Sequence, residues 1–302
     1  MARSKTETAP AVLARGQRSR LTLPIIALAG ALAQTAYVWR GIGRARAFAA
    51  EGRRYQRRVP APVLRILILG DSTGVGIGAA RPEDTIAGLL AAEFPQADIV
   101  NVSQSGARVS HVARQARRCI RLGWHFDLAL AHVGGNDVLR ATPIDRLVIA
   151  SQHLMTELTR LADRTVWLGP LDIGLAPLFP PPYSWLLAAR SHAAARVFAA
   201  CAQAHGAQFI DFCTSDHSDH FLRERRASFA VDGLHPSSSA YRYGYAALRA
   251  AMQRREDETV PASLPAGVAR AARCATPVGA ASIALDDAAW RSRAETEIAM
   301  SR

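Results

Sequence analysis

Cysteine is scarce in this 302-residue sequence, and the four cysteines form neither a CxxC motif nor a cluster with metal-ligand spacing. We therefore expect isolated thiols that pack as small apolar side chains, and no metal site. These cysteines are Cys119, Cys201, Cys213 and Cys274. With 49% hydrophobic and 21% charged residues, the composition also excludes collagen-like, disulfide-rich and wholly disordered chains.

Nucleotide-binding motifs are missing as well. The stretch from Gly74 to Gly78 is Gly-Val-Gly-Ile-Gly, which lacks the GxGxxG spacing of a dinucleotide site, and no Lys-Ser or Lys-Thr pair follows it. The next predicted strand contains Asn101 and offers no acidic residue to hold a ribose. The sequence therefore predicts neither a dinucleotide site nor an NTPase phosphate loop, and we expect no cofactor.

Acidic side chains are rare only near the N-terminus. The chain carries a formal net charge of +12, with a sequence pI of about 10.6. Residues 1–60 hold twelve basic and two acidic side chains, whereas the remaining residues hold 25 basic and 23 acidic ones. A nucleic-acid-binding domain would carry its basic residues on the folded surface, so we expect no nucleic-acid partner.

Charge is absent from Leu21 to Trp39, a run flanked on both sides by arginines. As a helix this run would be about 28 Å long, close to the thickness of a hydrocarbon core. Three interpretations stay open: a membrane anchor, a signal peptide cleaved near Ala31-Leu32-Ala33, and a helix that packs on the domain. Both flanks are basic, so the charge pattern does not assign a side of the membrane. We expect membrane association through this segment, with export after cleavage as the alternative.

Short apolar runs alternate with longer amphipathic stretches from residue 64 to residue 254. This alternation is typical of parallel strands joined by crossover helices. It predicts an α/β fold, a three-layer α/β/α sandwich around a parallel five-stranded sheet. The predicted strands are 64–69, 98–102, 127–133, 165–168 and 208–212, and the predicted helices are 83–94, 109–122, 144–163, 185–204 and 237–254.

The chain divides into three parts on this pattern. Residues 1–60 form a basic N-terminal region that contains the apolar segment, and residues 61–255 form the α/β domain. Residues 256–302 have little periodicity, and we predict a poorly ordered C-terminal tail there.

Polar blocks occur where ligands of such sheets bind, at the carboxyl ends of the strands. Ser72 follows the first predicted strand, and Asp232 and His235 precede the last helix. A serine hydroxyl becomes a good nucleophile only when a base removes its proton. Asp232 can bind the Nδ1–H of His235, which leaves Nε2 to face Ser72. We therefore predict that these three residues form a catalytic triad.

Two further blocks supply hydrogen-bond donors. Gly106 follows the second predicted strand and Asn136 follows the third. Acyl transfer passes through an oxyanion that needs donors fixed in advance. The backbone N–H groups of Ser72 and Gly106 and the side-chain amide of Asn136 can supply three such donors. Glycine at position 106 leaves room for a substrate carbonyl.

Together these blocks resemble the SGNH-hydrolase superfamily, also called GDSL esterases and lipases. The family's four blocks carry Ser, Gly, Asn and His in this order, which here match Ser72, Gly106, Asn136 and His235. The family's acid matches Asp232, and the resemblance covers about residues 64–254. It implies a flavodoxin-like sheet with strand order 2-1-3-4-5. It also implies hydrolysis of esters or thioesters through an acyl-enzyme, without metal.

Position 73 departs from the family pattern, because Thr73 stands where many members have leucine. We expect this exchange to be tolerated, since the residue is not itself catalytic. The proline-rich, apolar stretch 169–184 is either a stiff connection packed on the core or a wall of the substrate pocket. On the second interpretation, Phe179, Tyr183 and Trp185 line an acyl pocket.

Several functions remain open on this site. A basic N-terminal segment near a bilayer favours lipid esters, whereas short-chain acyl esters and acetylated sugars are alternative substrates. Acyl transfer to an alcohol and a non-catalytic binding protein are the alternatives to hydrolysis. The spacing Gly70-x-Ser72-x-Gly74 also fits the nucleophile elbow of α/β-hydrolases. That fold needs more strands before the elbow and an acid far from its histidine, so we reject it.

Overall fold

A single parallel sheet forms the centre of the protein, whose computed structural model describes residues 18–258. The strand order is β2-β1-β3-β4-β5, which confirms the predicted fold and strand order. The strands are β1 (Leu64–Gly70), β2 (Ala97–Asn101), β3 (Phe126–His132), β4 (Ala162–Leu168) and β5 (Gln208–Ile210). Their apolar residues are largely buried, because helices cover both faces of the sheet.

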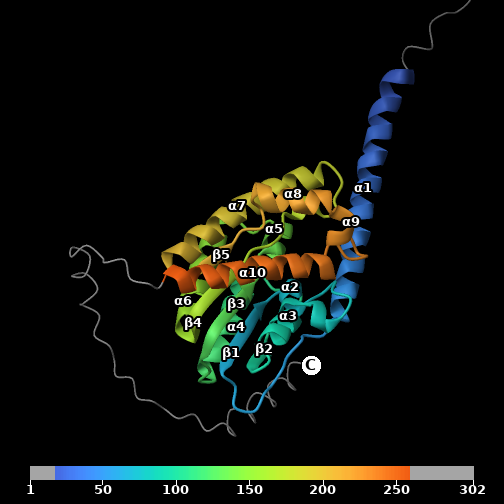
Figure 1. Ribbon diagram of the computed structural model, residues 1–302. Helices are drawn as coiled ribbons and strands as arrows, with labels where there is room; N and C mark the ends of the chain where they lie inside the picture. The colour runs from blue at the N-terminus through green and yellow to red at the C-terminus, as the bar shows by residue number, and fades with distance from the viewer. Residues whose placement is uncertain (1–17, 259–302) are drawn as a thin grey trace, which may run out of the picture.

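The helices form the two outer layers of the sandwich (Figure 1). One face is covered by α4 (Val109–Arg121), α6 (Ile144–Leu161) and α7 (Tyr183–Ala204). The other face is covered by α3 (Ile86–Glu93) and α10 (Ser238–Glu258). Each connection returns the chain to the edge of the sheet at which the next parallel strand starts. The carboxyl ends of all five strands therefore lie together at the other edge.

Short helices lie in the connections. They are α2 (Ser72–Val75), η1 (Pro82–Asp84), α5 (Gly135–Leu139), η2 (Ile173–Leu175), α8 (Ser215–Arg223) and α9 (Arg225–Ser228). Three of them, α2, α5 and η2, follow the carboxyl ends of β1, β3 and β4. They carry the chain away from the edge of the sheet at which a ligand site is expected.

The N-terminal helix α1 (Arg18–Ala50) extends well past the charge-free run. Its first half projects beyond the body of the protein, whereas its second half lies beside α2 and α9 (Figure 1). Val38, Ala45 and Ala49 are buried in this second half. A Cβ atom at Gly41 would lie 2.0 Å from Leu178 Cδ1, so a larger residue there would require the Leu178 side chain to move. Small residues at helical spacing therefore let α1 pack closely against the domain.

The segment after α1 also contacts the domain. Arg57 forms an antiparallel bridge with Ile99 of β2, and the guanidinium of Arg58 lies 3.2 Å from the carboxylate of Asp98. The second half of α1 and this segment thus pack on the α/β body. The sequence pattern assigns both to a separate N-terminal region that ends at residue 60. Within the described residues, no helix combines the length and apolar character needed to cross a membrane. In the tail predicted for 256–302, residues 259–302 lie outside the described residues.

The proline-rich stretch 169–184 serves both roles considered for it. Its first part, from Pro170 to Ile173, lines a cavity at the sheet edge. Its later part packs against α1: the Thr35 and Tyr183 hydroxyls are hydrogen-bonded at 2.8 Å, and Gln34 donates to the Pro181 carbonyl. The stretch therefore connects the pocket to the N-terminal helix.

Candidate active site

Ser72 begins α2 directly after β1, at the carboxyl edge of the sheet. Asp71 caps this helix: its Oδ1 accepts hydrogen bonds from the Thr73 N–H at 2.9 Å and the Thr73 hydroxyl at 2.7 Å. Burial raises the pKa of Asp71, while the hydrogen bonds from Thr73 act in the opposite direction. Thr73 is thus not a neutral replacement for leucine, because its hydroxyl holds the residue that precedes Ser72.

His235 reaches Ser72 from the connection between α9 and α10. Its Nε2 lies 3.0 Å from Ser72 Oγ, and its Nδ1 lies 2.5 Å from Asp232 Oδ2. The structure therefore brings together the three residues predicted as a triad. The His235 ring is nearly buried, with 7% of the residue exposed, so solvent competes little for these contacts.

Asp232 is fixed by the backbone of its own turn. Its Oδ1 accepts from the N–H groups of Leu234 and His235, both at 3.0 Å, which leaves Oδ2 for the imidazole. Burial alone would raise the pKa of Asp232, but the hydrogen bonds from His235 and Leu234 bring the pKa below its usual value. The carboxylate is thus held ionised and aimed at Nδ1, the arrangement that leaves Nε2 to act as a base.

The predicted oxyanion donors lie around the same serine. Gly106 has a φ of +78°, a conformation that disfavours any residue with a side chain. Among the protein atoms, a Cβ there would meet only Arg140 Nη2, at 3.7 Å, so the backbone conformation is what favours glycine in the structure itself. Within residues 18–258, the N–H groups of Ser72 and Gly106 have no hydrogen-bond acceptor. Both are therefore available to a substrate oxygen.

Asn136 supplies the third predicted donor from the first turn of α5. Its Nδ2 donates to Asp71 Oδ2 at 3.4 Å, a long contact that directs the amide toward the residue before Ser72. The neighbouring Asp137 is buried and accepts from the Val109 N–H at 2.8 Å and the Thr142 hydroxyl at 3.0 Å. These bonds fix α5 to the start of α4, and with it the position of Asn136.

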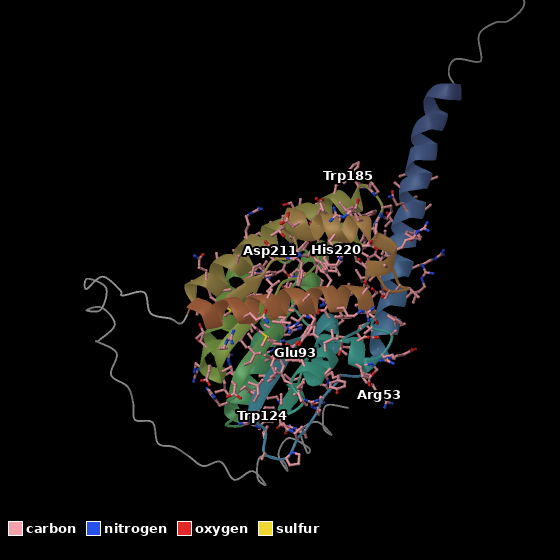
Figure 2. The ribbon with its side chains drawn as sticks, in the orientation of Figure 1. Arg53, Glu93, Trp124, Trp185, Asp211 and His220 are labelled. Atoms are coloured by element: carbon pink, nitrogen blue, oxygen red, sulfur yellow. The ribbon has the colours of Figure 1, made fainter. Side chains whose placement is uncertain are left out.

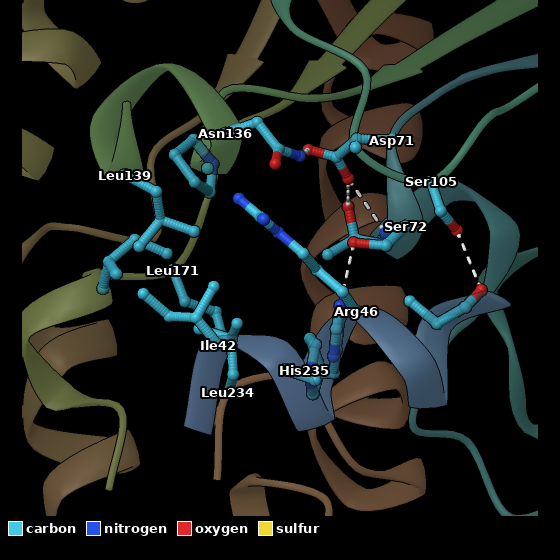
Figure 3. Close-up of a pocket in the computed structure, with 18 of the residues that line it drawn as sticks. Ile42, Arg46, Asp71, Ser72, Ser105, Asn136, Leu139, Leu171, Leu234 and His235 are labelled. Carbon is cyan, nitrogen blue, oxygen red and sulfur yellow. Dashed lines mark hydrogen bonds between the residues drawn. The ribbon is translucent and has the colours of Figure 1, made fainter. Parts of the chain in front are cut away.

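Ser72, His235, Asn136 and Gly106 line one cavity of about 530 Å³. Figure 3 shows it bounded by the catalytic groups on one side and by apolar side chains on the other. The apolar part contains Ile42, Leu139, Leu171, Ile173 and Leu234. Its volume lies within the usual range for small-molecule sites. The arrangement combines a nucleophile, a base and oxyanion donors beside an apolar chamber.

A sequence model of the GDSL-like lipase/acylhydrolase family matches residues 68–243, more than half of the chain. The chain belongs to this family. All five predicted catalytic and oxyanion residues fall within the matched segment. The structure has the fold that the resemblance to this family implies.

Similar proteins are consistent with this family. A GDSL-like esterase of Mycobacterium tuberculosis is 27% identical over 201 residues, which cover 62% of this chain and 61% of the relative. The chain therefore spans less than two thirds of that relative's length. Among solved structures, TesA aligns with a TM-score of 0.50 and 20% identity, covering 63% of this chain and 98% of TesA. The esterase EstA from Pseudoalteromonas sp. aligns with a TM-score of 0.50 and 19% identity, covering 64% and 98%. These two structures share the fold.

The three aromatic residues predicted to line an acyl pocket lie outside the lining of this cavity. Trp185 is 70% exposed on the first turn of α7, and Phe179 is buried in the core. Tyr183 contacts Thr35 of α1 instead. The prediction relied on the closeness of these residues in sequence to the loop at the pocket. In the structure the loop leaves the cavity after Ile173, and the three rings lie elsewhere.

Instead, helix α1 supplies one wall of the cavity, which sequence reasoning missed. Ile42, Arg46 and Ala49 line it, and the hydroxyl of Ser105, in the loop after β2, donates to the Ala49 carbonyl at 3.3 Å. The Phe48 ring centroid lies 6.4 Å from that of His235. The sequence did offer one signal: Gly41, Ala45 and Ala49 are small residues four positions apart, a spacing that marks one face of a packed helix.

Other histidines lie apart from the site. His132 ends β3, and its buried Nδ1 has no hydrogen-bond partner among the described residues. Burial lowers the pKa of His132 to about 4. His217 and His220 lie on α8, where His217 Nδ1 is 2.7 Å from the Tyr243 hydroxyl and His220 stacks on the Tyr243 ring at 3.8 Å. In the part of the chain that the structure describes, no group of three potential metal ligands occurs.

Proposed function

We propose that this protein is a serine hydrolase that cleaves carboxylic esters through an acyl-enzyme. One observation carries the proposal: His235 is hydrogen-bonded to Ser72 Oγ at 3.0 Å and to Asp232 Oδ2 at 2.5 Å. A base that contacts both a serine hydroxyl and an orienting carboxylate is the arrangement that activates a serine nucleophile. The family match supports the same chemistry.

The reaction proceeds in two halves. Ser72 Oγ attacks the ester carbonyl carbon while His235 Nε2 takes the hydroxyl proton. The tetrahedral intermediate collapses, the bond to the alkoxy oxygen breaks, and the imidazolium gives its proton to the departing alcohol. Water then attacks the acyl-enzyme with His235 again as base, which releases the carboxylic acid and restores the Ser72 hydroxyl.

The oxyanion of both intermediates lies among three donors. These are the N–H groups of Ser72 and Gly106 and the side-chain amide of Asn136. Each donor is fixed before substrate arrives: Gly106 by its left-handed backbone, and Asn136 by Asp71 and the bonds that anchor α5. Loss of one such donor usually costs about 3–4 kcal/mol of transition-state stabilisation.

The acyl chain occupies the apolar part of the cavity. Ile42, Leu139 and Ile173 provide this surface, and α1 closes it on one side. Burying apolar surface contributes about 0.8 kcal/mol per methylene. An apolar acyl group therefore gains binding energy that acetate lacks, which favours lipid or medium-chain esters over acetylated sugars.

Hydrolysis of p-nitrophenyl esters of increasing chain length by the full chain tests this proposal. Wild-type protein is expected to release nitrophenolate, with an optimum above acetate, and Ser72→Ala is expected to abolish turnover. Ser110→Ala is the matched control, because Ser110 lies on α4 outside the cavity. Equal turnover by Ser72→Ala and wild type would reject the proposal.

We also propose that the projecting half of α1 binds a membrane surface. Leu28 and Leu32 are both 62% exposed on this half, and Trp39, farther along the same helix, is 67% exposed. Trp185 and Leu186 are also exposed, beside the contact between Tyr183 and α1, at the edge of the body from which α1 projects (Figure 2). Large apolar side chains gathered at one end of a molecule are typical of a lipid-facing surface.

Cosedimentation with phospholipid vesicles tests this membrane proposal. The Leu28→Ser/Leu32→Ser variant is expected to bind vesicles at least tenfold more weakly than wild type, since each exposed leucine contributes about 1.5–3 kcal/mol when buried. Ile149→Ser is the matched control, because Ile149 is 53% exposed on α6. Unchanged vesicle binding by the double variant would reject the α1 surface.

A further inference from the structure

Two arginines face the cavity that holds Ser72. Arg46 comes from α1, and Figure 3 shows its side chain extending across the cavity toward Asn136 and Leu139. Arg140 caps α5, one turn after Asn136, where its N–H donates to the Asn136 carbonyl at 3.1 Å. Its Nη2 lies 3.7 Å from where a Cβ at Gly106 would be, so this guanidinium lies next to an oxyanion donor. Two guanidinium groups thus lie near the predicted oxyanion donors of this cavity.

The guanidinium groups of Arg46 and Arg140 keep their hydrogen-bond donors available, although the charge of Arg140 also acts on the buried carboxylate of Asp137. Within residues 18–258, the side chains of Arg46 and Arg140 make no hydrogen bond or ion pair. The two carboxylates that line the cavity have other partners. Asp71 accepts from Thr73 and Asn136, and Asp172 accepts from the Gly174 N–H at 2.8 Å, with His192 Nε2 at 3.6 Å from its second oxygen. The carboxylates of Asp71 and Asp172 are thus held by other groups, and the N–H donors of the two arginines stay available to a ligand in the cavity that holds Ser72.

We propose that Arg46 and Arg140 form a subsite for an oxyanion, so that the substrate is an ester carrying a phosphate or a carboxylate near the scissile bond. This inference rests on the proposed esterase function and specifies its substrate class. A guanidinium matches the geometry of both groups with two parallel donors. An apolar acyl chain and an anionic group then bind in the same cavity, the first against Ile42 and Leu139 and the second between the arginines.

Matched pairs of neutral and anionic esters test the subsite in the full chain. The phosphate arm compares 1-butyrylglycerol 3-phosphate with 1-butyrylglycerol, and the carboxylate arm compares p-nitrophenyl hydrogen adipate with its methyl ester. Wild type is expected to favour the anionic member of at least one pair in kcat/KM. Preference in the phosphate arm assigns the anion to the leaving group, and preference in the carboxylate arm assigns it to the acyl group.

Arginine variants show whether the two guanidinia cause this preference. Arg46→Gln/Arg140→Gln is expected to lower the anionic-to-neutral ratio of kcat/KM by about tenfold to a hundredfold, as loss of hydrogen bonds to a charged group does. Arg46→Lys, which keeps the charge, is expected to retain part of the preference. Arg44→Gln is the control, because Arg44 lies on the same helix but outside this cavity, and it is expected to leave the ratio unchanged.

Two readouts separate failure of the subsite from failure of the esterase. The wild-type ratio is expected to fall as sodium chloride is raised, a test that needs no variant. Labelling by a neutral alkyl fluorophosphonate measures the serine chemistry independently of the arginines. Labelling without any anionic preference, or with a preference that the double variant retains, overturns the subsite alone. Absence of both labelling and hydrolysis overturns the esterase and the subsite together.

Discussion

The catalytic centre and the α1 wall enclose the same cavity but are built differently. Ser72, Asp232 and His235 lie in short connections at the sheet edge, and each is held by hydrogen bonds to its immediate neighbours. Helix α1 approaches from outside the sandwich and is held by close packing of small residues, such as Gly41 against Leu178. We therefore expect substitutions at the sheet edge to affect the reaction itself, and substitutions on the docked helix to affect which esters are hydrolysed.

The largest effect is predicted for loss of the histidine at the catalytic centre. His235→Ala removes the base that contacts Ser72 Oγ, and kcat is expected to fall on the order of 10⁶-fold, as in other serine hydrolases. His153→Ala is the control, because His153 is exposed on α6. Steady-state hydrolysis of a p-nitrophenyl ester measures both. A loss below about tenfold for His235→Ala would contradict its role as the base.

The second-largest effect on kcat is predicted for Asp232, the acid that orients His235. Asp232→Asn keeps the shape of the side chain but removes the charge that favours the tautomer with Nδ1–H, so kcat is expected to fall by about 10⁴-fold. Asp219→Asn, on α8, is the matched control. Because hydrogen bonds hold the Asp232 pKa below its usual value, its carboxylate stays ionised through mildly acidic pH. Activity of Asp232→Asn near the wild-type level between pH 6 and pH 9 would contradict this role.

The oxyanion site is expected to contribute less than the triad. Asn136→Ala should lower kcat by about 10²–10³-fold with little change in KM, because the lost donor acts mainly in the transition state. Gln104→Ala removes an exposed amide from the neighbouring loop and serves as the control. Equal effects of Asn136→Ala on kcat and on substrate binding would place its amide outside the oxyanion site.

A substitution in the cavity wall formed by α1 is predicted to change kcat/KM by an amount that depends on the acyl chain length. Ile42→Ala removes apolar surface from the cavity, and kcat/KM for an octanoyl ester is expected to fall by about tenfold, consistent with the loss of about 1.5 kcal/mol of burial. The acetyl ester is expected to change less than about twofold, because a short acyl group does not reach the wall. An equal loss for both esters would show that α1 affects the catalytic centre rather than selectivity.

The smallest effect concerns Thr73. Thr73→Val removes the hydroxyl that donates to Asp71 but keeps the N–H bond, so unfolding free energy is expected to fall by about 1 kcal/mol and kcat by a few-fold. Thr159→Val is a control, because its hydroxyl bonds only to a carbonyl of its own exposed helix face. Denaturant unfolding and steady-state kinetics measure both quantities. Unchanged kcat in Thr73→Val would show that the Asp71 contact does not affect Ser72.

Sequence alone predicted the sheet and the catalytic centre, because both depend on local patterns. The apolar run from Leu64 to Leu69 became β1, and the block that follows it carries Ser72. Parallel strands place their carboxyl ends at one edge, so the residues after them had to meet. The three-residue spacing of Asp232 and His235 is short enough to fix their contact within one turn.

The cavity wall could not be predicted in the same way. Phe179, Tyr183 and Trp185 are near the site in sequence, but their directions depend on how stretch 169–184 docks on α1. Arg46 is distant from the other site residues in sequence, and only the packing of Gly41 and Ala45 against the body aims it at the cavity. Such contacts between remote segments have no local sequence period to mark them.

The central claim is that His235 activates Ser72 within one preformed cavity, and chemical labelling tests it most directly. The full chain is treated with an alkyl fluorophosphonate, and the adduct is located by peptide mass spectrometry. We predict a single adduct on Ser72 in wild type, and labelling slowed by several orders of magnitude in His235→Ala. An adduct on another residue, or equal labelling of Ser72 in His235→Ala, would contradict the account.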